Sequence, residues 1–330
     1  MLIVFISKKI MKAIKVIEDN LVISETPVPL PRDDEVLIKV KAAGINRADI
    51  AQRKGLYPPP AGASEILGLE CSGIIESVGK NVSARQPGDE VIALLGGGGY
   101  GEYVTCPQFH TLYKPASLDW IEAASIPEVY ATCWLNLFME ASMKEGDKVV
   151  FHAGASGIGT AGIQLAKAFG CESFVSAGSE NKIDMCINLG ASDGEVRSRD
   201  IFSKIKSWAP EGVDVILDPV GAEYFESNLN VLGIEGRLVI IGLMSGAQTN
   251  LNLGHLMIKR QKIIGSTIRA RNVETKNIVM EELSQKVLPL FKSGELIPII
   301  HETYPLSESE KAHEIMEANE NIGKIILTLD

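Results

Sequence analysis

The pattern of apolar and polar residues changes character near residue 129. Before that point the apolar runs are short, rich in β-branched residues and bounded by Gly or Pro, as in Val36–Gly44, Cys71–Gly79 and Asp89–Leu95. Runs of this kind predict strands. After them, the glycine-rich stretch Gly96–Val104 predicts a mobile loop. Short strands at this spacing predict a compact, barrel-like β-rich domain.

After residue 129, strand-like runs alternate with helix-like runs. Strands are predicted at Lys148–Ala153, Glu172–Gly178, Gly212–Asp218, Gly236–Gly242 and Lys262–Ile268. Helices are predicted at Ile158–Phe169, Asn181–Leu189 and Glu223–Leu232, with Gly170 and Gly190 ending the first two. This alternation predicts an α/β domain with a doubly wound parallel sheet.

The C-terminal part returns to a different pattern. A long amphipathic helix is predicted after Thr275, a second helix at Glu308–Asn319 and a closing strand at Gly323–Leu329. A chain of 330 residues is long for one hydrophobic core. We therefore predict one domain from residues 1–128 and 276–330, and a second from residues 129–275.

The opening stretch MLIVFISKKI is apolar, but it is too short to span a bilayer and no cleavage pattern follows it. Because Met11 begins a natural first strand, residues 1–10 are interpreted as a mis-set start or a frayed extension. No other segment is apolar enough to cross a membrane.

Charge and cysteine content narrow the function classes. The net charge of −10 argues against nucleic acid or an anionic membrane as the main partner. The five cysteines form no C-x-x-C pair and are odd in number, which favours neither a disulfide framework nor a zinc cluster. Reduced thiols and a cytoplasmic location are expected.

The stretch HAGASGIGTAGIQLAKAFG, residues 152–170, combines a strand end, a glycine turn and a helix start. Such a turn can hold a pyrophosphate on the backbone N–H groups of the helix N-terminus. Serine stands at the middle position of the usual Gly-x-Gly-x-x-Gly pattern. The alternative is a β–α turn that needs glycine only for packing. The predicted cofactor-binding residues here are Gly154, Ser156, Gly157, Ile158 and Gly159.

The second predicted strand distinguishes between the two nicotinamide dinucleotides. NAD sites usually place an acidic residue at the end of this strand, whereas this chain reads Ser176-Ala177-Gly178-Ser179. Ser179 and Lys182 can instead contact a 2′-phosphate, as a hydroxyl donor and a cation. The alternative is a solvated helix start with Ser179 or Asn181 as its cap. The predicted cofactor is NADPH.

Three longer stretches carry a more specific resemblance: Ala42–Gly73, Ala124–Trp134 and Ala318–Leu327. Through them the chain resembles the zinc-free NADPH:quinone oxidoreductases (zeta-crystallin-like) of the medium-chain dehydrogenase/reductase family, especially the tumour-suppressor-inducible quinone oxidoreductases. The resemblance implies a GroES-like β-rich barrel domain plus a Rossmann domain, with the nicotinamide in the cleft between them. It also implies a homodimer formed through edge strands, here Lys262–Ile268.

The resemblance further implies particular residues. A tyrosine that flanks the adenosine phosphate in the family is replaced by Arg197, which can pair with that phosphate. Zinc-dependent relatives carry Cys and His where this chain has Asn46 and Leu69, and the four-cysteine lobe is absent, so no metal is expected. The remaining implied cofactor contacts are Asn46, Thr132, Val220, Gly242, Leu243, Met244, Arg269, Arg271 and Asn321.

Two residues are the predicted catalytic groups. Tyr57 can stack on a planar quinone and donate to its oxygen, or pack as a loop tyrosine against Pro58–Pro60. Asn46 can orient the nicotinamide or the substrate carbonyl, or be a turn asparagine. No triad or pair of carboxylates is evident, the histidines are scattered, with His152 interpreted as structural, and solvent is expected to supply the proton.

The predicted function is NADPH-dependent reduction of a quinone or related electrophile by hydride transfer without a metal. One alternative is an alkenal or enone C=C reductase, which needs the same cofactor and an oxyanion partner. Another is a non-enzymatic NADPH-binding protein, which the acidic balance disfavours if its ligand is RNA.

Overall fold

A computed structural model describes residues 9–329 and divides the chain into two units. Unit 1 comprises residues up to Glu128 together with Arg269–Lys292 and residues from Pro298 onward. Unit 2 comprises Val129–Ile268 and Ser293–Ile297. The interpretation of residues 1–10 lies outside the described residues, except that Ile10 already begins the first strand.

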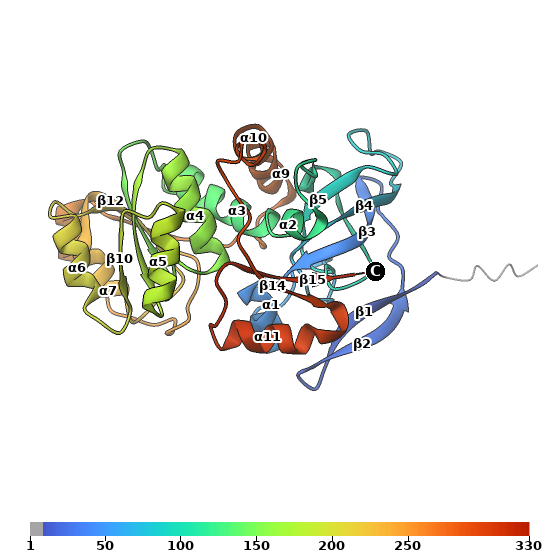
Figure 1. Cartoon of the computed structure of the whole chain (residues 1–330), viewed down its shortest axis with the longest axis horizontal. Coiled ribbons are helices and arrows are strands. Elements are labelled where there is room, and N and C mark those ends of the chain that lie inside the picture. Colours follow the sequence, from blue (N-terminus) through green and yellow to red (C-terminus); the bar gives the residue numbers. More distant parts are fainter. Residues whose placement is uncertain (1–8, 330) are drawn as a thin grey trace, which may run out of the picture. The chain divides into compact units, whose positions relative to one another are not determined.

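Unit 1 is built on an antiparallel-rich sheet of order β14-β15-β3-β4-β5-β7, with β6 paired to β3 and a separate hairpin β1-β2. In Figure 1, helix α11 lies beside β14 and β15. The elements are β1 Ile10–Ile17, β2 Asn20–Pro27, β3 Glu35–Gly44, α1 Arg47–Arg53, β4 Glu70–Val78, β5 Glu90–Leu94, β6 Tyr103–Pro107, η1 Gln108–His110, β7 Thr111–Tyr113, α2 Trp120–Ala124, α9 Val273–Glu282, η3 Leu283–Val287, α10 Leu288–Ser293, β14 Ile300–Pro305, η4 Leu306–Glu308, α11 Ser309–Glu317 and β15 Lys324–Thr328.

The strands of unit 1 form because β-branched residues occupy the buried positions. β3 pairs with β4, β6 and β15, and the side chains of Val36, Ile38 and Val40 are buried. These side chains join a core that also includes Ile325 and Leu327 of β15. The C-terminal strand therefore completes the N-terminal sheet, and the β-rich character predicted from the sequence is confirmed.

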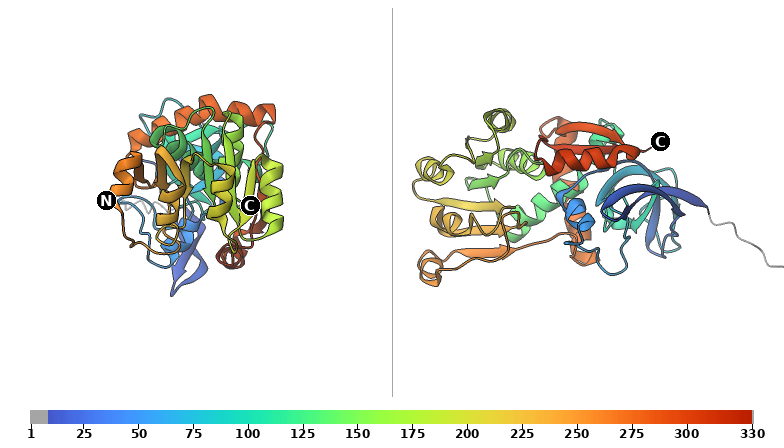
Figure 2. Two further views of the ribbon diagram at one scale, coloured as in Figure 1. Left: turned by 90° about the vertical axis from the view of Figure 1, so that its left-hand side faces the viewer. Right: turned by 90° about the horizontal axis from the view of Figure 1, so that it is seen from below.

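Unit 2 contains a six-stranded sheet of order β10-β9-β8-β11-β12-β13, in which every pairing is parallel. Figure 2 (left) shows these strands between layers of helices. The elements are β8 Lys148–His152, α4 Gly157–Ala168, β9 Glu172–Ala177, α5 Glu180–Leu189, β10 Asp193–Val196, α6 Ile201–Trp208, β11 Val213–Asp218, α7 Phe225–Val231, β12 Leu232–Ile240, α8 Leu253–Lys259 and β13 Lys262–Gly265; α3 Pro127–Cys133 spans the unit boundary and continues as the π-helical turn η2 Trp134–Glu140.

The doubly wound parallel sheet predicted from the alternating pattern is confirmed. Gly170 and Gly190 follow α4 and α5 with φ angles of 73° and 117°, the left-handed conformation that favours glycine after a helix. The sequence analysis did not identify β10, α6, α8 or β14. β10 has only four residues, DGEV, and lacks the β-branched run that marks the other strands.

The second boundary between the units lies at residues 268/269, seven residues before the predicted position. The reason is Arg269, whose guanidinium Nε donates to the Gly96 carbonyl at 2.9 Å. Residues 293–297 fall in unit 2 because Gln164 and Ile297 exchange two hydrogen bonds, of 2.9 and 3.1 Å. At each of these two places a polar side chain makes hydrogen bonds within the unit to which the chain passes. No change of composition marks either boundary in the sequence.

No helix among residues 9–329 is long and apolar enough to cross a membrane.

Candidate active site

The predicted phosphate-binding turn lies between β8 and α4 in unit 2. Ser156 caps the helix, since its Oγ accepts a hydrogen bond from Gly159 N at 3.1 Å. Its hydroxyl proton stays available for donation to an anion. A Cβ at Gly159 would lie 2.2 Å from the Gly154 carbonyl oxygen, and one at Gly154 would lie 2.7 Å from Val175 Cβ. The turn is therefore too tight for side chains at either glycine, which fits close approach by a pyrophosphate.

Cationic side chains surround the end of β9, where Ser179 precedes α5. The Arg197 backbone N donates to the Ala177 carbonyl at 2.8 Å. A Cβ at Gly178 would lie 3.7 Å from an Arg197 guanidinium nitrogen, so this guanidinium lies over the exposed glycine. Glu180 faces a different arginine, Arg199, at 2.6 Å. The end of β9 thus carries the Arg197 guanidinium, while Glu180 is paired with Arg199.

Two further loops meet at the same edge of the parallel sheet, where β11 and β12 end. The Val220 carbonyl accepts from Ser245 N and from Ser245 Oγ, at 2.8 and 2.9 Å. Met244 N donates to the Pro219 carbonyl at 3.3 Å, and a Cβ at Gly242 would lie 2.7 Å from that oxygen. The predicted residues Val220 and Gly242–Met244 are therefore brought together beside the carboxyl ends of the strands, where open parallel sheets bind ligands.

Buried polar side chains support this edge from within unit 2. His152 Nε2 is 2.8 Å from Asn228 Oδ1, and Asn228 Nδ2 donates to Asp218 Oδ2 at 3.1 Å. Asp218 Oδ1 in turn accepts from the Val220 backbone N at 2.6 Å. Burial lowers the pKa of His152 and raises that of Asp218. The chain of bonds orders the Val220 loop, which agrees with a structural role for His152.

In unit 1, Asn46 is held by a buried ion pair. Lys324 Nζ donates to Glu70 Oε1 at 2.6 Å, to Asn46 Oδ1 at 2.7 Å and to the Ile45 carbonyl at 2.7 Å. Asn46 Nδ2 donates to the same Glu70 oxygen at 2.9 Å. All three ammonium protons have acceptors, and both ends of the asparagine amide are oriented. A Cβ at Gly44 would lie 2.3 Å from Glu70 Oε1, so glycine makes the space for this carboxylate.

A second carboxylate fixes the backbone of Asn46. Asp49 Oδ2 accepts from Asn46 N at 2.8 Å, and Asp49 Oδ1 accepts from Gly68 N at 2.9 Å. Tyr100 OH lies 3.3 Å from Asp49 Oδ2 and 3.0 Å from His313 Nε2. Burial raises the pKa of Asp49 to about 6, and the two backbone N–H donors partly offset this rise.

Glu128, at the start of α3, is a buried acidic side chain that the sequence analysis overlooked. Its backbone N donates to Glu70 Oε2 at 2.8 Å, and its own Oε2 is buried with no hydrogen-bond partner among the described residues. Burial, followed by the charge of Glu70, raises the pKa of Glu128 to about 8. The Glu70 carboxylate contacts the backbone N of Glu128 and not its carboxyl group, so the expectation that no pair of carboxylates is evident stays a prediction. The signal for Glu128 was an acidic residue inside the apolar run Ala124–Trp134.

The loop that carries Tyr57 is tied down by Arg269. The guanidinium donates to the Gly96 carbonyl at 2.8 and 2.9 Å, to Gln52 Oε1 at 2.7 Å and to the Tyr57 carbonyl at 3.3 Å. It also lies 5.3 Å from the centre of the Tyr57 ring. Arg269 is only 3% exposed. In this structure it positions the Tyr57 loop within unit 1, and its contact with a cofactor stays a prediction.

The other predicted cofactor residues occupy varied places. Asn321 Nδ2 donates to the Gly323 carbonyl at 2.8 Å, directly before β15. The Thr132 carbonyl accepts from Asn136 Nδ2 at 2.8 Å within the turn from α3 to η2. Ile158 lies in the first turn of α4 and Lys182 in that of α5, while Arg271 precedes α9. No contact in the structure tests their predicted roles.

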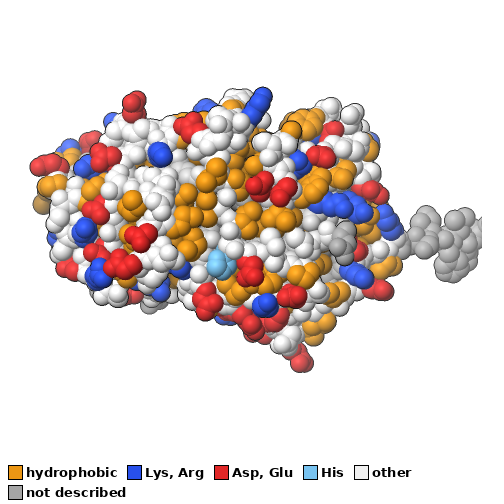
Figure 3. Space-filling model, viewed as in Figure 1, with side chains coloured by type: hydrophobic (Ala, Val, Ile, Leu, Met, Phe, Trp, Pro, Cys, Tyr) orange, Lys and Arg blue, Asp and Glu red, His pale blue; other side chains and the backbone are white. Residues whose placement is uncertain are grey.

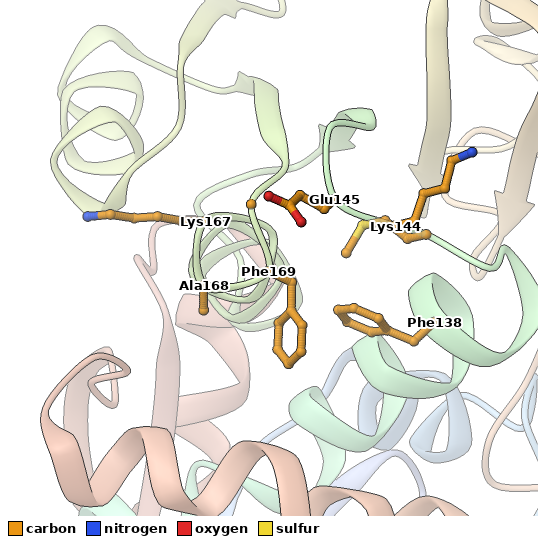
Figure 4. A pocket seen from close by; sticks show the side chains of 8 residues that line it. Phe138, Lys144, Glu145, Lys167, Ala168 and Phe169 are labelled. Atoms are coloured by element: carbon orange, nitrogen blue, oxygen red, sulfur yellow. The ribbon is translucent and has the colours of Figure 1, made fainter.

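A surface hollow of about 530 Å³ lies elsewhere in unit 2, between the end of α4 and the loop before β8. Figure 4 shows the rings of Phe138 and Phe169 along it, with centroids 4.8 Å apart, and the Glu145 carboxylate above them. None of the predicted site residues lines this hollow.

Within residues 9–329, no three His, Cys, Asp or Glu side chains form a group that could hold a metal ion. Leu69, where zinc-dependent relatives carry histidine, is fully buried. The metal-free reaction stays a prediction.

The two halves define a class of protein: a β-rich unit with a charged interior, and a parallel-sheet unit with a dinucleotide-binding edge. Comparison with known proteins agrees. Residues 32–116 match the family described as alcohol dehydrogenase GroES-like domain, and residues 157–285 match the family described as zinc-binding dehydrogenase. The human quinone oxidoreductase is 33% identical over 332 residues, covering 98% of this chain and 99% of the relative.

Solved structures give the same result. The mycobacterial protein Rv1454c, solved in complex with NADPH, superposes with a TM-score of 0.87 at 26% identity, over 97% of this chain and all of the other. The enoyl reductase CurK gives a TM-score of 0.84 at 29% identity, over 97% of this chain and 99% of the other. The chain belongs to the medium-chain dehydrogenase/reductase family of oxidoreductases, and the resemblance to its quinone oxidoreductases is confirmed.

Proposed function

We propose that this protein is an NADPH-dependent quinone oxidoreductase that transfers hydride without a metal. The observation that carries the proposal is the charge arrangement at the end of β9. Arg197 lies over Gly178, while Glu180 and Glu195 share Arg199, at 2.6 and 3.1 Å. An acidic residue in this place would bind ribose hydroxyls and repel a 2′-phosphate, whereas a guanidinium attracts that phosphate.

The turn between β8 and α4 fits the rest of the dinucleotide. The tight contact of Gly154 with Gly159 leaves room at the helix start, where Ser156 keeps a proton to donate. Pyrophosphate oxygens would be held there by backbone N–H groups. When bound, the reduced nicotinamide supplies the hydride.

Residues of unit 1 would orient the substrate. Asn46 Oδ1 accepts from Lys324, and one Nδ2–H donates to Glu70. The other Nδ2–H makes only a long contact of 3.4 Å with the Gly44 carbonyl, so it is the donor that the amide would offer to a substrate oxygen. A donor held in advance of the reaction stabilises the oxyanion that develops as hydride adds to a carbonyl. Tyr57, whose loop Arg269 fixes, offers an aromatic face for a planar quinone.

A second candidate is reduction of the C=C bond of an alkenal or enone. The likeness to the enoyl reductase CurK favours it. The site offers the same donor to an enolate oxygen as to a quinone oxygen, so the substrate must be decided by turnover. A third candidate, NADPH binding without catalysis, finds less support because the buried groups around Asn46 would then have no task.

A basic patch would favour nucleic acid as a ligand of such a binding protein. On the face in Figure 3, acidic and basic side chains are intermixed. The net charge of −10 also disfavours a polyanionic partner. We propose a small-molecule electrophile as the partner, with no nucleic acid or membrane, and a cytoplasmic location.

We further propose that the protein is a homodimer. β13 lies at the end of the parallel sheet, and α8, directly before it, exposes Leu253, Met257 and Ile258 by 69%, 72% and 73%. An open strand edge beside an apolar helix face suits a second copy of the same surface.

The test is anaerobic oxidation of NADPH and of NADH with phenanthrenequinone and with hexenal as alternative acceptors. We expect quinone turnover with NADPH, and a loss of about tenfold or more in the preference for NADPH when Arg197 becomes Ala. The matched control is Arg260→Ala, which removes an exposed arginine that pairs with Glu235 and is not among the predicted cofactor residues. Turnover of hexenal alone would assign the protein to the C=C reductases, and binding without turnover would favour the non-catalytic role.

A further inference from the structure

Glu128 is an unusual side chain for the place it occupies. It is 8% exposed, and its Oε2 atom is buried without a hydrogen-bond partner among the described residues. An unsatisfied buried carboxyl oxygen costs free energy, commonly ~1–3 kcal/mol or more. A glutamine or an apolar residue would fill the space without an ionisable group. The presence of a buried carboxyl group here therefore suggests that Glu128 has a chemical function.

The geometry connects the backbone of Glu128 to the predicted catalytic asparagine through the carboxylate of Glu70. Both oxygens of the Glu70 carboxylate are engaged: Oε1 accepts from Asn46 Nδ2 at 2.9 Å, and Oε2 accepts from Glu128 N at 2.8 Å. One carboxylate thus holds the start of α3 against the end of β3. Glu128 and Asn46 are fixed on the two sides of the same group.

We propose that Glu128 is the proton donor of the reaction, and that Glu70 and Lys324 are positioning residues that hold it beside Asn46. The inference rests on the proposed reductase function and deepens it. It replaces solvent, the proton source expected from the sequence, with a side chain of this protein.

The proton balance is straightforward. Hydride addition brings two electrons and one proton to the substrate and leaves an oxyanion, either a hydroquinone monoanion or an enolate. The O–H bond of Glu128 breaks, a new bond to hydrogen forms on that anion, and the electron pair stays on the Glu128 carboxylate. Solvent then reprotonates the carboxylate. In sum, quinone, reduced nicotinamide and one proton give hydroquinone and oxidised nicotinamide.

The charged groups around Glu128 keep its proton in place before the reaction. Burial and the carboxylates of Glu70 and Asp49 raise its pKa, while the ammonium groups of Lys324 and Lys276 oppose the rise, and the pKa lies at about 8. These groups come from four different elements: Glu70 from β4, Asp49 from α1, Lys324 from β15 and Lys276 from α9. An acid with a pKa close to neutral pH both holds a proton and releases it readily.

The decisive experiment compares Glu128→Gln with the wild type for phenanthrenequinone and hexenal across pH. Glutamine keeps the shape and cannot donate the proton. We expect kcat to fall about tenfold with the quinone, whose reduced anion is stable, and about 100-fold with hexenal, whose enolate needs the acid more. The wild-type rate should decline above about pH 8, and this decline should vanish in the variant.

Two further variants separate catalysis from structure. Glu128→Asp, which keeps the acid, should restore part of the rate and an alkaline decline. Glu25→Gln changes an exposed carboxylate on β2 and should leave rate and pH profile unchanged. NADPH affinity, measured by fluorescence, should be the same in all variants.

The outcomes are distinct. A wild type that reduces neither acceptor would refute the proposed function and this inference with it. An active wild type whose turnover and alkaline decline survive in Glu128→Gln would overturn the inference alone. If Glu128→Gln fails to fold, the pH profile of Glu128→Asp decides, because a proton donor with a changed side chain must shift the alkaline decline.

Discussion

The two units bury charge very differently. Among the described residues, the Asp, Glu, Lys and Arg side chains buried in unit 1 are Asp49, Glu70, Glu128, Arg269, Lys276 and Lys324, whereas those buried in unit 2 are Asp147 and Asp218. In unit 2, Asp147 pairs with Arg237 at 2.6 Å. Asp218 accepts backbone and amide hydrogen bonds.

The difference agrees with the separate tasks that the proposed function gives to each unit. In the proposed function, unit 2 would bind the cofactor mainly through its backbone, at the tight turn of Gly154 and Gly159, with the Arg197 guanidinium added for the 2′-phosphate. Unit 1 works through side chains, whose charges are buried, paired and able to shift pKa values. A cofactor that carries its own charge needs the first kind of site, and proton movement needs the second.

The largest effect on stability is expected from removing one partner of the buried ion pair between Glu70 and Lys324 in unit 1. Lys324→Met leaves the Glu70 carboxylate buried without its cation, and Lys324 is only 3% exposed. We expect a loss of about 3–5 kcal/mol in the free energy of unfolding, measured by urea denaturation. In the double variant Glu70→Leu, Lys324→Met both charges are gone, and much of this loss should be recovered.

The control for this experiment lies on the surface. Lys311, on α11, is 3.7 Å from Glu308 and its side chain is 61% exposed. Lys311→Met should change the free energy of unfolding by less than about 0.5 kcal/mol. Equal effects of the Lys311 and Lys324 substitutions would contradict the assignment of a distinct charged interior.

The pH dependence of stability tests the buried charges of unit 1 in a second way. The pKa of Glu128 is raised from an ordinary value of 4.5 to about 8 in the folded protein. As pH rises through this window, the unfolded chain releases the proton while the folded chain retains it. The wild type therefore loses stability between about pH 4.5 and about pH 8 on account of this group.

Glutamine does not titrate, so Glu128→Gln escapes that loss. We expect the variant to gain about 2–4 kcal/mol relative to the wild type between low pH and about pH 9, with no further gain above that. Urea denaturation at several pH values measures it, with Glu25→Gln as the reference for an exposed carboxylate. A stability difference that is constant with pH would mean that Glu128 titrates normally in the folded protein.

The sequence predicted unit 2 better than unit 1, for a physical reason. The site in unit 2 depends on residues adjacent in sequence: Gly154, Ser156 and Gly159 form one turn, and the absence of an acid before Ser179 is visible directly. The site in unit 1 depends on pairs far apart in the chain. Asn46 and Lys324 meet across 278 positions, and Glu128 meets Glu70 across 58.

The burial of charged side chains also could not be predicted from the pattern of neighbouring residues in the sequence. Lys324 lies in a strand between Gly323 and Ile325, where a lysine is ordinarily expected to reach solvent. It is buried because the backbone carbonyl of Ile45 and two side chains satisfy its ammonium group. Likewise Arg269 was assigned to the cofactor from resemblance, and its contacts with Gly96 and Gln52 became evident only in three dimensions.

The smallest effect is expected from a change in the backbone-based site of unit 2. Gly159→Ala would place a methyl group 2.2 Å from the Gly154 carbonyl, so the turn must open. We expect NADPH affinity to fall about tenfold, equivalent to about 1.4 kcal/mol, as measured by fluorescence titration. The matched control is Gly265→Ala in β13, where a Cβ would meet nothing within 4 Å. If both substitutions weaken NADPH binding equally, the shape of the turn does not determine affinity, and the contrast between a backbone-built and a side-chain-built site fails in unit 2.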